Sequence, residues 1–171
     1  MNRMKVFGDK TTFCFEIGEK IDSPMRLVNI FIGGKNICSE DNIVYLPQFI
    51  NSIALSASDI RRKIDYYKYI NYFEWMSLEE AHNFLLSTRD IDSPHYNLEN
   101  DDLYQCHRIF SWGPTTDNVI CFLLPMNGML YLTYSFSSKI DLNNYNSFCG
   151  VAITPYEIVH VIIDALNELQ A

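Results

Sequence analysis

The chain lacks most of the features that mark an enzyme, a metalloprotein or a membrane protein. It has only seven glycines and contains neither GxxxxGK[ST] nor GxGxxG, which excludes the common glycine-rich phosphate-binding loops. Its five cysteines are scattered and include no CxxC pair, so they offer neither zinc-ligand spacing nor a disulfide framework. No stretch reaches the roughly 18 unbroken apolar residues of a membrane-spanning helix, and the N-terminal segment does not resemble a signal peptide. We therefore expect a cytoplasmic protein with reduced, mostly buried thiols.

Positive charge is scarce in the second part of the chain. Residues 1–68 carry ten Lys or Arg and eight Asp or Glu, whereas residues 69–171 carry three and thirteen. This excess of negative charge would repel nucleic-acid phosphates and anionic lipids, so we expect no direct contact with nucleic acid or membranes. It is compatible with a basic protein partner, and solubility alone is the other explanation.

What the chain does contain is typical of one globular domain spanning residues 1–171. Apolar residues make up 48% of the 171 residues and charged residues 20%, and no Pro/Gly/Ser linker divides them. "TTFCFEIGE" alternates with the period of two of a half-buried strand, with Phe13, Phe15 and Ile17 on one side. "MRLVNIFIGG" predicts another strand that ends at a Gly33-Gly34 hairpin turn, with "KNIC" as a short return strand. An antiparallel meander follows from this pattern.

The middle and the C-terminus of the chain predict helices. Pro47 suits a first helical turn, and the helix that follows either continues through "SASDIRRKIDYY" or gives way to a second one. Ser77 with Glu80, and Thr154 with Glu157, form capping-box patterns at the starts of two amphipathic segments.

Between these two segments the chain returns to strands. The predicted strand runs are "CHRIFSW", "VICFLLP" (buried on both faces), "MLYLTYSFS" and an edge strand "CGVAI", with a type I′ turn at Asn127-Gly128. The expected fold class is α+β, an antiparallel sheet packed against helices that include a C-terminal amphipathic helix.

The most unusual stretch is "RDIDSPHYNLENDD", residues 89–102, which we expect to be part of a loop reaching residue 104. It contains five carboxylates, and Tyr96 and Tyr104 lie within or beside it; the carboxylates are Asp90, Asp92, Glu99, Asp101 and Asp102. A calcium loop would need a glycine at its sixth position, which is missing here. Adjacent Asp101 and Asp102 would point to opposite faces of an extended chain, which disfavours an acid–base pair. Two interpretations remain: a surface that meets a basic protein, with Tyr72, Trp75 and Tyr145 as further aromatic anchors, or a solvated loop.

No other residues form a recognisable reaction centre, so we expect no enzyme activity, cofactor or bound metal. The four histidines (His82, His95, His107 and His160) have no ligand spacing and predict hydrogen-bonded structural or surface roles. No local base or cationic patch activates a cysteine. The alternative is a small cytosolic enzyme or ligand-binding α+β protein with a pocket between sheet and helices. A pocket lined by Cys106, His107 and Asp117 would support that alternative.

The order of several segments resembles the immunity protein 42 family of bacterial polymorphic-toxin and contact-dependent growth inhibition systems. The segments are "VFGDKTTFCFEI", "LVNIFIGGKNI", "MSLEEAHNFLLS", "HRIFSWGPTTDNVICFLL" and the closing amphipathic helix. Within them the shared positions are Phe7-Gly8-Asp9, Phe13, Glu16, Gly33 or Gly34, Trp112-Gly113 and Asp117. None of these is a catalytic signature, and we interpret them as scaffold.

The resemblance implies a cytoplasmic antidote that binds the C-terminal toxin domain of a large secreted effector one-to-one. Toxins of such systems are often nucleases, including RNases, whose basic clefts an acidic inhibitor could occupy. The family supplies no contact residues, because these should vary with the toxin. From charge and aromaticity alone we predict toxin binding by Asp90, Asp92, Tyr96, Glu99, Asp101, Asp102 and Tyr104.

Overall fold

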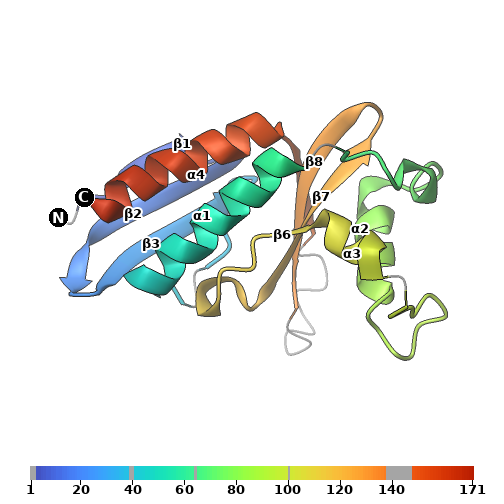
Figure 1. The fold of residues 1–171 in the computed structure, drawn as a ribbon, viewed down its shortest axis with the longest axis horizontal. Helices are drawn as coiled ribbons and strands as arrows, with labels where there is room; N and C mark the ends of the chain where they lie inside the picture. Colours follow the sequence, from blue (N-terminus) through green and yellow to red (C-terminus); the bar gives the residue numbers. More distant parts are fainter. Residues whose placement is uncertain (1–2, 39–40, 64, 100, 138–147) are drawn as a thin grey trace.

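The computed structural model describes residues 3–38, 41–63, 65–99, 101–137 and 148–171. These residues form two antiparallel sheets that share a core, rather than the one sheet expected from the sequence. Helices cover the N-terminal sheet on one side, and a second group of helices covers the other sheet at the opposite end of the molecule (Figure 1). The predicted α+β class is confirmed.

The N-terminal sheet is the predicted meander. Its strands run in the order β1-β2-β3-β4, with β5 also paired to β3. They are β1 (Lys5–Asp9), β2 (Phe13–Asp22), β3 (Met25–Ile32), β4 (Lys35–Asn36) and β5 (Ile43–Tyr45). Alternate residues of β3 are buried, as the period of two predicts. Gly33 and Gly34 both have positive φ, 58° and 84°, which confirms the hairpin turn and explains the need for glycine.

Two long helices cover the buried face of this sheet. They are α1 (Leu46–Arg62) and α4 (Pro155–Gln170). α1 is continuous to Arg62, so the helix that begins near Pro47 continues into the "SASDIRRKIDYY" segment and does not give way to a second helix there. Thr154 accepts from the Glu157 backbone N–H while the Glu157 carboxylate accepts from the Thr154 backbone N–H, so the predicted capping box of α4 is confirmed.

The second sheet has the order β6-β7-β8-β9. Its strands are β6 (Arg108–Ile109), β7 (Val119–Met126), β8 (Met129–Phe136) and β9 (Cys149–Ala152). β7 is buried on both faces, as predicted: Cys121 and Leu123 join the core shared with the N-terminal sheet, and Phe122 and Leu124 pack toward the second group of helices. The predicted turn at Asn127 and Gly128 is confirmed by φ values of 51° and 75°.

The second group of helices corrects part of the sequence prediction. It contains α2 (Leu78–Ser87), with the predicted Ser77–Glu80 capping box, α3 (Asp101–His107) and the short 3-10 helix η1 (Ile70–Tyr72). A further 3-10 helix, η2 (Pro114–Thr116), occupies the predicted turn before β7.

The loop predicted to reach residue 104 ends before α3, and the strand expected from Cys106 is reduced to β6. Two features explain the helix. Asp101 and Asp102 lie in its first turn, where carboxylates are favourable, and Leu103 and His107 bury one face.

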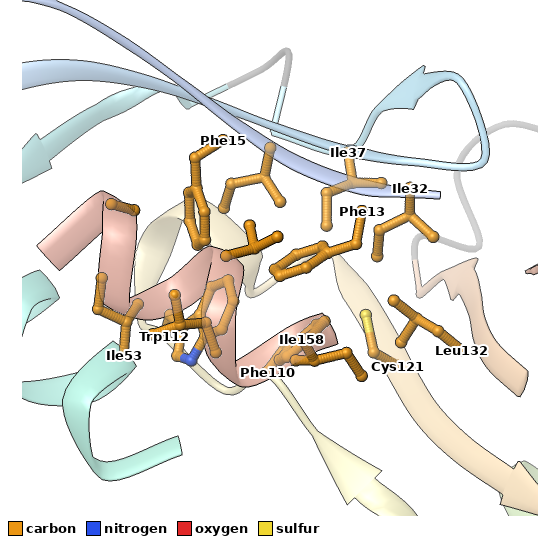
Figure 2. Close-up of a cluster of buried hydrophobic side chains, with 14 of the residues drawn as sticks. Phe13, Phe15, Ile32, Ile37, Ile53, Phe110, Trp112, Cys121, Leu132 and Ile158 are labelled. Atoms are coloured by element: carbon orange, nitrogen blue, oxygen red, sulfur yellow. The ribbon is translucent and has the colours of Figure 1, made fainter. Parts of the chain in front are cut away.

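An aromatic cluster joins the two sheets (Figure 2). The rings of Phe110 and Trp112 lie 4.4 Å apart, and the Phe13 and Phe15 rings pack against them. The indole N–H of Trp112 donates to Ser56 Oγ at 2.7 Å, which satisfies its polar group inside the core. The shared positions at Phe13 and Trp112 are therefore scaffold, as we interpreted them. No helix in the described ranges combines the length and apolarity needed to cross a membrane.

Candidate functional site

The segment that is richest in carboxylates forms η1, α2, the start of α3 and the intervening loop. These elements make up one end of the molecule (Figure 1). Residues 67–102 contain eight carboxylates and two cations, Lys68 and Arg89. This segment therefore carries −6 of the net charge of −8. The seven predicted binding residues, which lie in this segment or just after it, have different environments.

Asp101 and Tyr104 hold the base of the loop. Arg89, two residues after the end of α2, forms an ion pair with Asp101, and its guanidinium lies 4.3 Å from the Tyr104 ring centroid. The Asn97 backbone N–H also donates to the Thr88 carbonyl at 3.1 Å. These contacts close residues 90–99 into a compact loop. Tyr104 is half-buried with the Arg89 guanidinium over its ring, and its contact with a partner stays a prediction.

Asp102 is paired within the protein as well. Its carboxylate accepts from Lys68 Nζ at 2.7 Å and from the Tyr69 hydroxyl. The Lys68 hydrogen bond, followed by that of Tyr69, holds the pKa of Asp102 below its ordinary value. Asp101 and Asp102 are thus compensated within the protein, Asp101 by Arg89 of the same stretch and Asp102 by Lys68, which is 34 residues away in the chain.

Asp90, Asp92, Tyr96 and Glu99 are exposed on the closed loop. One oxygen of Asp90 accepts from the Asp92 backbone N–H at 3.1 Å, which shapes the turn. Within the described part of the chain, none of the three carboxylates forms an ion pair. Their charge is therefore available to a partner.

Aromatic side chains lie beside these carboxylates. Tyr69, Tyr72, Phe84 and His95 form successive ring contacts, which we call the aromatic row, with centroid distances of 6.1, 6.4 and 5.3 Å. Phe84 and His95 were not among the anchors expected from the sequence, because the helical spacing of Phe84 indicates a core position. Trp75, which was among them, is 95% exposed. Tyr145, the other expected anchor, lies outside the described residues.

The environments of the buried cysteines and histidines are those of structural residues, not of reactive ones. Burial raises the pKa of the Cys14 and Cys38 thiols to about 11, which keeps both in the unreactive thiol form. His82 lies between the Thr133 and Ser135 hydroxyls at 2.8 Å each, and His107 Nδ1 lies 3.0 Å from the Leu123 carbonyl. The structural roles predicted for these two histidines are confirmed. No group of three or more potential ligand residues that could hold a metal ion occurs among the described residues.

A cavity of about 400 Å³ lies between the end of α1 and the start of α4. Its apolar wall is rimmed by Arg61, Lys63 and His160. The described residues that line it include no cysteine, serine or carboxylate. Cys106, His107 and Asp117, which would have supported an enzyme, are not among them either.

The architecture, two antiparallel sheets joined by one core and covered by two groups of helices, defines a fold already seen in a solved structure. That structure is the crystal structure of CdiI from Burkholderia dolosa AUO158, with a TM-score of 0.65. The similarity covers 96% of this chain and 99% of that chain at 18% sequence identity, which shows a shared fold. Neither a family model nor a curated protein matches the sequence, so the narrower name of the immunity protein 42 family stays a resemblance.

Proposed function

We propose that the protein is a bacterial immunity protein that binds and neutralises the toxin domain of a contact-dependent growth inhibition effector. The observation that carries this proposal is the likeness in fold, over nearly the full length of both chains, to CdiI, a contact-dependent growth inhibition immunity protein. The resemblance found in the sequence implies the same class independently of the fold.

The distribution of charge supports a basic toxin surface as the target. Asp90, Asp92 and Glu99 present carboxylates without ion-pair partners among the described residues, on a loop whose base is fixed by Arg89. Carboxylates presented on such a closed loop can occupy the positions at which a basic nuclease cleft would hold phosphates. We therefore propose a nuclease toxin, blocked one-to-one by occlusion of its cleft, and place the main electrostatic contact on these three residues rather than on all five.

Association kinetics test the electrostatic part of the proposal. The probe is the toxin domain encoded by the reading frame adjacent to this gene, immobilised for surface plasmon resonance. The triple variant Asp90→Asn, Asp92→Asn, Glu99→Gln should bind at least about 10-fold more slowly at low salt, and its association rate should depend less on ionic strength. The dissociation rate should change less than the association rate, because long-range attraction acts mainly before contact.

A matched control tests whether the position of the three carboxylates matters, or only the net charge of the protein. The variant Glu19→Gln, Asp22→Asn, Asp41→Asn removes the same charge from exposed positions in and around the N-terminal sheet. It should associate at nearly the wild-type rate. If both triple variants slow association equally, general electrostatic attraction operates and the loop is not the contact. If the toxin domain forms no complex with the wild-type protein, the proposed function itself is wrong.

A further inference from the structure

Exposed apolar side chains are concentrated on the acidic end of the molecule. Fourteen large apolar residues are exposed among those described, and six of them lie between residues 67 and 98. These six are Tyr67, Tyr72, Trp75, Ile91, Tyr96 and Leu98. Single exposed apolar residues need no explanation, but a concentration of them beside uncompensated charge is typical of a protein interface.

Trp75 is the most exposed of the fourteen. The backbone on both sides of it is nevertheless fixed. Phe73, two residues earlier, is buried against α2 and α3, and Ser77, two residues later, is the N-cap of α2 with both capping-box hydrogen bonds formed. The Met76 backbone N–H donates to the Phe73 carbonyl at 3.0 Å. The fold therefore holds a large apolar ring in water on a hydrogen-bonded turn, and the ring adds hydrophobic stabilisation only if a partner covers it.

The aromatic row, which includes Tyr72 three residues before Trp75, offers further apolar surface to such a partner. Tyr72 is 48% exposed and stacks on Phe84 with an interplanar angle of 22°, and His95 packs on the same Phe84 ring. The row thus connects the turn that carries Trp75 with the loop that carries Asp90, Asp92 and Glu99. The segments that carry the aromatic row and these carboxylates lie at one end of the molecule (Figure 1).

We propose that Trp75, together with the exposed face of Tyr72, is the anchor of the toxin interface and inserts into an apolar pocket bordered by Lys or Arg side chains on the partner. This inference rests on the proposed function and adds a specific contact to it. The partner is a basic protein domain, because the segment surrounding the anchor has eight carboxylates and two cations. Aromatic anchors of this kind dominate dissociation, and because the backbone on both sides of Trp75 is already fixed, binding has to order only the side chain.

Kinetics of the adjacent toxin domain with Trp75→Ala test the anchor. We expect the dissociation rate to rise at least about 30-fold, with the association rate changed less than about 3-fold. The control is Tyr45→Ala, which removes a 49% exposed aromatic ring from β5 of the N-terminal sheet and should leave both rates unchanged. Because Trp75 is almost fully exposed, its removal should not unfold the protein, and urea unfolding of the free variant checks this.

Fluorine NMR of the complex provides a second readout, which uses the wild-type sequence and so does not depend on any substitution. The chain has two tryptophans, exposed Trp75 and buried Trp112, so 5-fluorotryptophan labelling gives two signals and leaves the unlabelled toxin silent. Saturating toxin should remove the H₂O/D₂O shift of the Trp75 signal and leave the Trp112 signal in place. A complex in which Trp75 keeps its solvent shift and Trp75→Ala dissociates at the wild-type rate overturns the anchor but not the immunity function. Absence of any complex with wild-type protein overturns both.

Discussion

At the scale of single residues, the structure uses several polar groups to stabilise itself rather than to react. His82 and His107 have no exposed surface, and burial lowers the pKa of each to about 4. Neither imidazole is therefore charged at neutral pH. The hydroxyls of Thr133 and Ser135 hold His82, and the Leu123 carbonyl holds His107. Both residues support the placement of α2 and α3 on the second sheet, and through these helices they support the candidate interface.

These two histidines should make the protein lose stability in mild acid. An unfolded histidine binds its proton near pH 6.5, whereas the folded forms resist protonation until about pH 4. Protonation therefore favours the unfolded chain as the pH falls through this window, by up to about 1.4 kcal/mol per pH unit for each histidine. Urea unfolding between pH 7.5 and 5 should show this slope, and His82→Gln should reduce it by about half. A stability that stays constant to pH 5 would contradict the assignment.

At the scale of secondary-structure elements, local sequence patterns predicted most of the fold. The strands with a clear period of two, the paired-glycine and Asn-Gly turns, and both capping boxes depend on neighbours within a few residues, so the sequence contains the information. α3 was missed because its seven residues give a weak periodic signal and its buried face depends on β7 and η1. The pairing of Asp102 was missed for a similar reason, since Lys68 and Asp102 are 34 residues apart in the chain.

The first hairpin provides a test of why glycine is required at the shared Phe7-Gly8-Asp9 position. Gly8 has a φ of +96°, and a Cβ there would lie 2.4 Å from the Phe13 carbonyl oxygen and 2.8 Å from a Val161 methyl on α4. Gly34 has a similar φ of +84°, but a Cβ at that position would meet no atom within 4 Å. Gly34→Ala should cost about 1–2 kcal/mol from backbone strain alone. Gly8→Ala should cost more than about 3 kcal/mol, because β2 and α4 cannot move apart freely.

Urea unfolding of the two alanine variants at the same pH measures the difference. Equal losses of stability would show that only the backbone conformation matters at Gly8. A larger loss at Gly8 identifies the close approach of β1 to α4 as the constraint, which makes this glycine part of the scaffold and not part of a binding surface.

At the scale of the whole molecule, the two ends have different compositions. The N-terminal sheet with α1 and α4 contains most of the cations and the cavity between the two helices. The opposite end contains the acidic loop, Trp75 and the aromatic row. The sequence alone predicted the acidic character of the second part of the chain. It could not show which carboxylates are paired, because that depends on how α2, α3 and η1 meet on the second sheet.

Hydrogen–deuterium exchange of the complex with the adjacent toxin domain tests the central claim most directly, namely that this end of the molecule binds the partner. Exchange is compared for the protein alone and with saturating toxin. We expect slower exchange in residues 67–77 and 88–99, with little change in α1 and α4. Slower exchange confined to the α1–α4 cavity, or to the N-terminal sheet, with residues 67–99 unchanged, would contradict the account.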